Sequence, residues 1–212
     1  MFRTHIILAD ENTLMVDALK SLLQAEFEVV GTFSDGSALV EAAAGLRPDV
    51  IILDTSMPKM NGLIAGQRLR EMKPDVKLIY STMNRDQRIV AEAFRIGAKG
   101  YLLKSCTAGE LIRAIRIAAR GGVYVTPLMT DGVVGSFTRY FTPSRNNDEL
   151  TLRQKQVLQL LAEGRSMKEV ALILKVSART IAFHKYTMME HLQIKSNAEL
   201  LRYAMKTQIL AA

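Results

Sequence analysis

Hydrophobic positions in the first 120 residues fall into two alternating patterns. Five short runs are rich in β-branched and other apolar residues, and apolar residues at helical spacing follow each run, as Leu19, Leu22 and Leu23 do after the first. Runs that are apolar throughout, such as V-I-I-L at 50–53, are typical of parallel strands covered on both faces. The pattern predicts a doubly wound (βα)5 domain of the α/β class, with strands at His5–Leu8, Glu28–Phe33, Val50–Leu53, Lys77–Tyr80 and Gly100–Leu103.

The pattern changes after Gly121-Gly122. Residues 122–147 are rich in glycine, proline, serine, threonine and asparagine, which is the composition of a linker. Beyond them, four apolar repeats at helical spacing indicate a small all-α domain. We therefore divide the chain into residues 1–121, a linker at 122–147 and a helical domain at 148–212, with helices at Leu152–Ala162, Met167–Leu174, Ala178–Leu192 and Asn197–Thr207.

Composition and charge refine this division. The chain has 212 residues, of which 49% are hydrophobic and 23% are charged, so it is a globular protein and not a disordered one. Its formal net charge is +7, and residues 148–212 carry 10 basic and 6 acidic side chains, compared with 16 and 14 in residues 1–120. The excess of positive charge in the smaller domain indicates an anionic partner there.

Cysteine usage and the N-terminal residues bear on location. Cys106 is the only cysteine, so an internal disulfide and a cysteine-based zinc site are both excluded. The apolar run near the N-terminus is too short for a signal peptide or a membrane span. We therefore expect a protein of the reducing cytoplasm that has no membrane partner.

Polar side chains follow several of the predicted strands. Asp10 and Glu11 come after the first strand and Asp54 after the third, and ligand sites of open α/β sheets lie beyond the carboxyl ends of the strands. Converging carboxylates raise one another's pKa unless a cation compensates, and Mg²⁺ is the usual cation with oxygen ligands. With Lys104 after the fifth strand and Ser81-Thr82 after the fourth, this edge has the parts needed to accept and hold a phosphoryl group.

These polar side chains are also compatible with a purely structural role, in which Asp10 and Asp54 only cap helices and Lys104 is solvated. Two further classes fit less well. A hydrolase with an aspartate nucleophile usually carries a second aspartate two residues further on, where this chain has Ser56. A flavin or nucleotide site needs a glycine-rich or hydroxyl-rich loop after the first strand, and Asp10 and Glu11 would repel its phosphate. The sequence therefore favours a phosphoryl acceptor over an enzyme.

The motifs A-D-E at 9–11, L-D-T-S-M-P-K-M-N-G at 53–62 and G-Y-L-L-K at 100–104, together with Ser81, resemble those of response-regulator receiver domains, which have a flavodoxin-like fold. The resemblance implies that Asp54 is the phosphorylated residue and that Asp10, Glu11, Asp54 and the Ser56 carbonyl hold Mg²⁺. It also implies switch roles for the Ser81 hydroxyl, the Tyr101 ring and the Lys104 ammonium group. Two positions depart from the family pattern, because Thr82 replaces a small alanine and Ser105 replaces proline.

Residues 150–181 carry a second set of motifs. The segments L-T-L-R-Q-K-Q-V-L-Q-L-L-A-E-G at 150–164, S-M-K-E-V-A at 166–171 and V-S-A-R-T-I at 176–181 resemble the LuxR-type helix-turn-helix domain. With the receiver motifs, the chain resembles a NarL/FixJ-type response regulator, a DNA-binding transcription factor and not an enzyme. The resemblance implies four partners: promoter double-stranded DNA, a cognate sensor histidine kinase, a second copy of the chain and RNA polymerase.

Helical phase describes the second helix of this motif independently of the family. If Ile181 faces inward at 100° per residue, Met188, Leu192 and Lys185 lie near the same stripe. The opposite face then carries two aromatic residues, Phe183 and Tyr186, which is unusual for a solvated helix. Such a face suits the major groove, where apolar side chains contact thymine methyl groups. The alternative is that these rings pack against the first domain or the linker.

The resemblance then assigns individual roles in DNA binding. Ser177 is the expected N-cap of the recognition helix, and the final helix, A-E-L-L-R-Y-A-M at 198–205, is the expected dimerisation helix. The expected base-reading positions are Ala182, Phe183 and Tyr186. The expected phosphate contacts are Lys168, Arg179, Thr180, His184 and Lys185.

Overall fold

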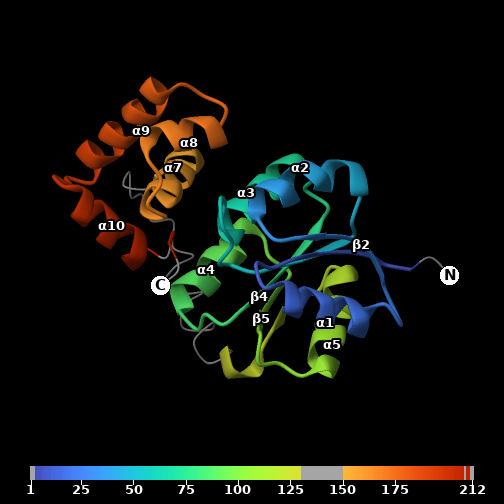
Figure 1. Ribbon diagram of the computed structural model, residues 1–212. Helices are drawn as coiled ribbons and strands as arrows, with labels where there is room; N and C mark the ends of the chain where they lie inside the picture. The colour runs from blue at the N-terminus through green and yellow to red at the C-terminus, as the bar shows by residue number, and fades with distance from the viewer. Residues whose placement is uncertain (1–2, 130–149, 208, 211–212) are drawn as a thin grey trace. The chain divides into compact units, whose positions relative to one another are not determined.

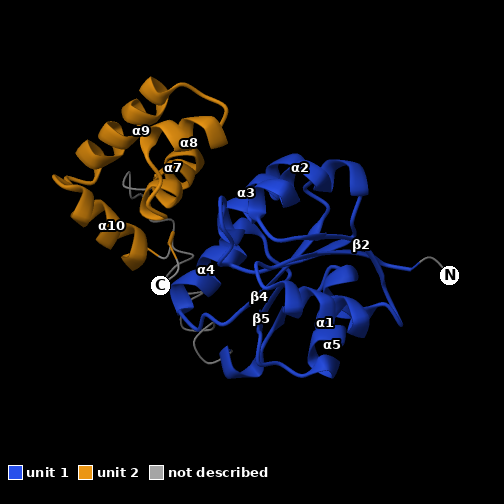
Figure 2. Ribbon diagram, viewed as in Figure 1, with its two compact units in different colours: residues 1–144 blue, residues 145–212 orange. Residues whose placement is uncertain are grey.

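The computed structural model describes residues 3–129, 150–207 and 209–210. The chain forms two compact units, residues 1–144 and residues 145–212 (Figure 2). Most of the linker expected at 122–147 lies outside the described residues. Within the part of the chain that the structure describes, no helix is both long enough and apolar enough to cross a membrane.

The first unit is built on a six-stranded sheet in the order β2-β1-β3-β4-β5-β6, in which every neighbouring pair is parallel. Its four central strands are almost wholly buried, as the continuous apolar runs predict. The doubly wound α/β fold class is thus confirmed. The strands are β1 (His5–Ala9), β2 (Glu28–Phe33), β3 (Val50–Leu53), β4 (Lys77–Thr82), β5 (Gly100–Leu103) and β6 (Tyr124–Val125).

The sixth strand corrects the expectation of five strands. β6 begins at Tyr124, inside the range expected to be linker, and pairs with β5 through Gly100↔Tyr124 and Tyr101↔Val125. Thr126 extends this pairing, because its backbone N–H donates to the Tyr101 carbonyl at 3.0 Å and its hydroxyl accepts from the Leu103 N–H at 3.2 Å. A strand of two residues is too short to show a period of two, so its sequence gives no strand signal.

Five helices cover the sheet on both faces (Figure 1). On one face, α1 and α5 bury Val16, Leu23 and Ile115 against strand residues such as Ile52 and Ile79. On the other face lie α2, α3 and α4, and a polar side chain caps the N-terminus of every one of the five helices. The helices span Thr13–Leu23 (α1), Gly36–Leu46 (α2), Gly62–Met72 (α3), Gln87–Ile96 (α4) and Ala108–Ala119 (α5).

The second unit contains only helices among its described residues. Each helix begins at the expected residue, because Thr151, Ser166, Ser177 and Ser196 accept hydrogen bonds from the backbone N–H groups of the first turns. The last three helices end one residue earlier than expected. The helices span Leu152–Ala162 (α7), Met167–Ile173 (α8), Ala178–His191 (α9) and Asn197–Lys206 (α10).

The core of the second unit is a single cluster contributed by all four helices. Leu158, Val170, Ile181, Met188 and Leu200 are almost fully buried in it. Ile181 and Met188 both come from α9, which matches the stripe that helical phase assigns to that helix. The α9 face opposite to this stripe is therefore the one that the second unit leaves uncovered.

A glycine pair gives a test of packing beside the sheet edge. A Cβ atom on Gly62, at the start of α3, would lie 1.9 Å from the Asp54 carbonyl oxygen, whereas one on Gly45 in α2 would meet nothing within 4 Å. Gly62→Ala should therefore lower the free energy of unfolding of the first unit by about 1–3 kcal/mol. Gly45→Ala should raise it by about 0.5–1 kcal/mol, because alanine is the better helix former.

Hydrogen exchange of the buried amides in β1, β3 and β4 measures this difference for the first unit alone. Equal protection in the two variants would contradict the tight fit of Gly62 against the residue that follows β3.

Candidate functional site

The strand order brings two aspartates together at the carboxyl edge of the sheet. β1 and β3 are neighbours, with Ala9 paired to Leu53, so the next residues, Asp10 and Asp54, leave the sheet side by side. The Asp54 N–H donates to the Ala9 carbonyl at 2.8 Å, which continues the pairing by one step. Both side chains are buried, with exposed fractions of 4% for Asp10 and 5% for Asp54. Two like charges out of water require a compensating cation.

Lys104 supplies that cation from the end of β5. Its Nζ lies 2.7 Å from Asp10 Oδ2 and 2.7 Å from Asp54 Oδ2. Burial alone lowers the pKa of Lys104, but the hydrogen bonds and negative charges of Asp10 and Asp54 outweigh it and raise the pKa above the ordinary lysine value. The lysine is therefore a fixed ammonium group that neutralises one of two negative charges, and the site keeps a net negative charge.

Backbone groups orient the other carboxylate oxygens. Asp10 Oδ1 accepts from the Asn12 N–H at 3.0 Å, and Asp54 Oδ1 accepts from the Ser56 N–H at 3.2 Å. Glu11, by contrast, is exposed. Among the described residues, no three histidine, cysteine, aspartate or glutamate side chains are grouped so as to hold a metal ion. The structure thus brings Asp10 and Asp54 together but leaves the third expected carboxylate apart from them.

The donor chemistry of this site nevertheless fits a hard divalent cation. Asp10 and Asp54 present buried carboxylate oxygens, Glu11 is the next residue after Asp10, and Ser56 lies two residues after Asp54. Carboxylates and backbone carbonyls are the ligands that Mg²⁺ takes, and it usually retains several waters.

The expected switch residues lie around the same edge. Ser81 and Thr82 end β4, and both are buried. Tyr101 on β5 is fully buried, and its hydroxyl donates to the Asn84 carbonyl at 3.0 Å. Burial raises the pKa of the Tyr101 phenol, and the nearby charge of Asp54 adds to the rise. The Tyr101 ring therefore already lies in the interior of the first unit in this structure.

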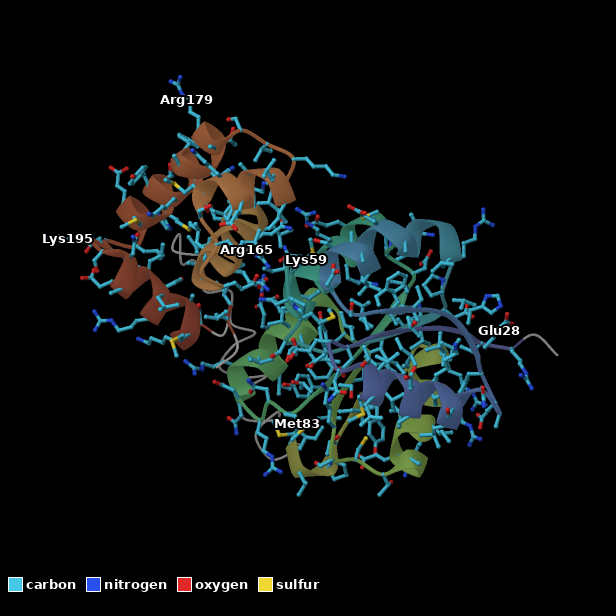
Figure 3. The ribbon with its side chains drawn as sticks, viewed as in Figure 1. Glu28, Lys59, Met83, Arg165, Arg179 and Lys195 are labelled. Atoms are coloured by element: carbon cyan, nitrogen blue, oxygen red, sulfur yellow. The ribbon has the colours of Figure 1, made fainter. Side chains whose placement is uncertain are left out.

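Two features of this edge escape prediction from the sequence. The first feature is the contact between Thr55 and Thr82, whose hydroxyl oxygens are 2.7 Å apart in the interior. Leu53 lies opposite Tyr80 in the paired strands β3 and β4, so Thr55 and Thr82, two residues further on, also lie opposite each other. The second feature is Lys59, whose Nζ lies 2.7 Å from Asp35 Oδ2. Asp35 also caps α2, so this ion pair ties the loop after β3 (Figure 3) to the start of α2.

In the second unit, the expected DNA-reading residues lie on α9. Ser177 Oγ accepts from the Thr180 N–H at 3.1 Å and is the N-cap. Phe183 and Tyr186 are exposed by 66% and 60%, although large aromatic side chains are usually covered. Arg179 is exposed, and its side chain extends away from the first turn of the helix (Figure 3). Ala182 is half-buried on the same helix. This face is apolar in its middle and basic at its start.

Two of the expected phosphate contacts are held by neighbouring rings. The Lys185 Nζ lies 5.7 Å from the centre of the Tyr186 ring, and the half-buried His184 ring packs edge-on against Phe183 with 5.9 Å between the ring centres. Burial lowers the pKa of His184, and the charge of Arg153 lowers it further. Both effects favour the neutral form of the His184 imidazole.

Other exposed side chains of the second unit have a bearing on partners. Lys168 on α8 is exposed, in keeping with its expected phosphate contact. On α10, Leu201 and Met205 are 40% and 46% exposed and lie one turn apart, while Leu200 and Ala204 are buried in the core. One face of α10 therefore belongs to the core and an adjacent face presents apolar side chains to solvent.

Comparison with known families divides the chain in the same way as its two units. Residues 6–116 match the response regulator receiver domain, and residues 148–204 match the luxR family of bacterial regulatory proteins. The oxygen regulatory protein NreC of Staphylococcus carnosus is 37% identical over 213 residues, which cover 97% of this chain and 98% of that protein. NreC of Staphylococcus haemolyticus is 34% identical over the same extent.

Solved structures share the fold. The RcsB response regulator of Salmonella typhimurium superposes with a TM-score of 0.64 at 24% identity, covering 98% of this chain and 99% of that one. RcsB of Salmonella enterica serovar Typhimurium bound to a promoter superposes with a TM-score of 0.62 at 24% identity, covering 97% of this chain and all of that one.

Replacing Lys104 tests its role in compensating charge. In metal-free buffer at pH 7, Lys104→Met leaves two buried carboxylates without their cation and should lower the free energy of unfolding by about 3–5 kcal/mol. In the wild type, the raised pKa of Lys104 means that its charge stabilises the fold fully below the ordinary lysine value and that this contribution is lost at higher, alkaline pH.

Denaturant titrations of the first unit between neutral and alkaline pH measure the loss in the variant and the pH dependence of the wild type. The control is Lys20→Met on the exposed surface of α1, which should change stability by less than about 0.5 kcal/mol. An unchanged free energy of unfolding in Lys104→Met at pH 7 would contradict the charge argument.

Proposed function

This chain belongs to the response regulators in which a receiver domain precedes a LuxR-type DNA-binding domain, and we propose that phosphorylation of Asp54 controls its binding to promoter DNA. The observation that carries the proposal is the arrangement of Asp10, Asp54 and Lys104, in which one ammonium group lies between two buried carboxylates. We retain the division into a receiver (1–121), a linker (122–147) and a DNA-binding domain (148–212) as part of the proposal.

In this reaction an Asp54 carboxylate oxygen attacks the phosphorus atom of a donor. The new oxygen–phosphorus bond forms as the bond from phosphorus to the leaving group breaks, and the electron pair of that bond departs with the leaving group. Lys104 stands 2.7 Å from Asp54 Oδ2, so it stabilises the negative charge that the phosphoryl group brings. The buried Ser81 hydroxyl and the Tyr101 ring are the proposed switch residues on the same edge.

Mg²⁺ held by Asp10, Glu11, Asp54 and the Ser56 carbonyl would neutralise charge on the transferring phosphoryl group. The residues themselves keep Asp54 oriented, through the Ser56 N–H and the Lys104 ammonium group. The phosphoryl group stays on the chain's own Asp54 carboxylate, so the chain is the product of the transfer, which is why we do not class it as an enzyme. A sensor histidine kinase is the proposed phosphoryl donor, and the cytoplasm, where promoter DNA is found, is the proposed place of action.

The α9 face is the proposed reader of the major groove. Phe183 and Tyr186 are exposed, and with Ala182 they offer apolar contacts to thymine methyl groups. Contacts to phosphates position the helix without reading sequence. We propose that these come from Ser177, Arg179, Thr180, His184 and Lys185 on or beside α9 and from Lys168 on α8.

Dimerisation through α10 is the proposed means of reading two half-sites. Leu201 and Met205 form the exposed apolar patch of this helix, and pairing the same patch on two copies gives a two-fold axis. Operator half-sites would then lie about one helical turn apart. RNA polymerase is a further proposed partner at the promoter.

The first prediction from this proposal concerns phosphorylation. Incubation with Mg²⁺ and acetyl phosphate should add one base-labile phosphoryl group per chain, and Asp54→Ala should abolish its uptake because the acceptor oxygens are gone. Replacing both Asp10 and Glu11 by alanine should reduce the yield by weakening Mg²⁺ binding. Mass spectrometry of the intact protein measures all three.

An unchanged yield in the double alanine variant would rule out the proposed metal ligands. If Asp54→Ala binds its operator as tightly as the phosphorylated wild type, the chain is instead a DNA-binding protein that does not depend on phosphorylation. Coupling between phosphorylation and DNA affinity of about 5- to 150-fold is the expected range.

The second prediction separates contacts to phosphates from contacts to bases. Lys168→Ala should weaken binding to all DNA sequences alike and flatten the dependence of affinity on salt, because a charged contact to the backbone is lost. Phe183→Ala and Tyr186→Ala should reduce discrimination by about 1–3 kcal/mol at individual base pairs and leave the salt dependence nearly unchanged. Affinity selection from a random DNA library, repeated at two salt concentrations, measures both effects.

Each class of variant is the control for the other. Recovery of the wild-type consensus, at wild-type affinity, by Phe183→Ala and Tyr186→Ala would show that the aromatic face serves packing and not base reading.

A further inference from the structure

Two threonine hydroxyls lie in the interior directly beside the phosphoryl acceptor. Thr55 follows Asp54 after β3, and Thr82 is the last residue of β4. Their Oγ1 atoms are 2.7 Å apart, and Thr55 Oγ1 lies 3.4 Å from Asp54 Oδ1. Thr55 is exposed by 6% and Thr82 by 1%, so water does not screen this pair. The two hydroxyls are therefore placed to respond to the charge on Asp54.

The direction of these hydrogen bonds follows from their partners. Asp54 Oδ1 is a carboxylate oxygen and only accepts, so the Thr55 proton is directed towards it. Thr55 Oγ1 must then accept from the Thr82 hydroxyl. Thr82 Oγ1 in turn accepts from the Asn84 N–H at 3.1 Å. All three bonds consequently point the same way, from the Asn84 amide through two hydroxyls to the carboxylate, and bonds in such a chain strengthen one another.

The same backbone segment contacts the tyrosine of β5. The Asn84 carbonyl accepts from the Tyr101 hydroxyl at 3.0 Å, so Asn84 is bonded on one side to Thr82 and on the other to Tyr101. The family resemblance assigns the switch role to the Ser81 hydroxyl. Among the residues that the structure describes, the Ser81 side chain makes no hydrogen bond to another residue. In this structure, the path from Asp54 to Tyr101 runs through the threonines.

We propose that Thr55 and Thr82 are positioning residues that relay the charge state of Asp54 to the Asn84 backbone and to Tyr101. The inference rests on the proposed phosphorylation of Asp54. A free carboxylate is a strong, charged acceptor for the Thr55 hydroxyl, and an acyl phosphate offers a neutral carbonyl in its place. Phosphorylation therefore weakens the bond from Thr55 to Asp54, and because bonds in the chain strengthen one another, it also weakens the bond from the Asn84 N–H to Thr82.

The test uses the full chain with the Asn84 amide and the Tyr101 ring assigned by NMR. Both signals should shift when acetyl phosphate and Mg²⁺ are added to the wild type. Thr55→Val has the same shape but no hydroxyl, and it leaves the bond from the Asn84 N–H to Thr82 in place. In this variant both phosphorylation shifts should be lost, whereas Thr55→Ser, which keeps the hydroxyl, should restore them. Mass spectrometry of each sample verifies an equal extent of phosphorylation.

A second arm does not require phosphorylation. Asp54→Asn removes the charge, so it should shift the Asn84 and Tyr101 signals in an otherwise wild-type chain and leave them unmoved in a chain that also carries Thr55→Val. If the wild type takes up no phosphoryl group, the proposed function fails, and this arm still tests the relay. Shifts of wild-type size in Thr55→Val, in either arm, would overturn the relay and return the switch to Ser81.

Discussion

Two carboxylates of like charge lie buried side by side at the edge of the sheet, and the ammonium group of Lys104 is what makes that arrangement stable. This contact requires strands β1, β3 and β5 to end at the same level of the sheet. Asp10 follows β1, Asp54 follows β3 and Lys104 follows β5. The parallel register of the sheet provides that alignment. The apolar runs of the central strands thus matter to the chemistry as well as to the core, since a slip of register would separate the charges.

The second unit solves a different problem, which is to hold a recognition helix firmly while leaving one of its faces uncovered. Ile181 and Met188 anchor α9 in the core, and the Ser177 cap fixes where it begins. The opposite face exposes Phe183 and Tyr186 to solvent. Exposing large aromatic side chains to water is unfavourable, and the folding of this unit does not require it. In the function that we propose, DNA covers these rings.

Much of this architecture is predictable from sequence because it depends on local chemistry. Helix starts in the second unit follow from Thr151, Ser166, Ser177 and Ser196, whose hydroxyls satisfy free N–H groups of the first turns. Strand order and the rule for ligand sites suffice to place Asp10, Asp54 and Lys104 at one edge. The features that escape prediction depend on side-chain rotamers and on very short elements. They are the exposure of Glu11, the Thr55–Thr82 contact and the two-residue strand β6.

That last strand links the site to the rest of the chain mechanically. The Thr126 N–H is bonded to the Tyr101 carbonyl and the Thr126 hydroxyl to the Leu103 N–H, one residue before Lys104. The end of the first unit is thus hydrogen-bonded to β5, the strand that contains Tyr101 and directly precedes Lys104. Tyr124 also packs against the core that α5 shares with the sheet, so Tyr124–Thr126 are held by β5 on one side and by α5 on the other.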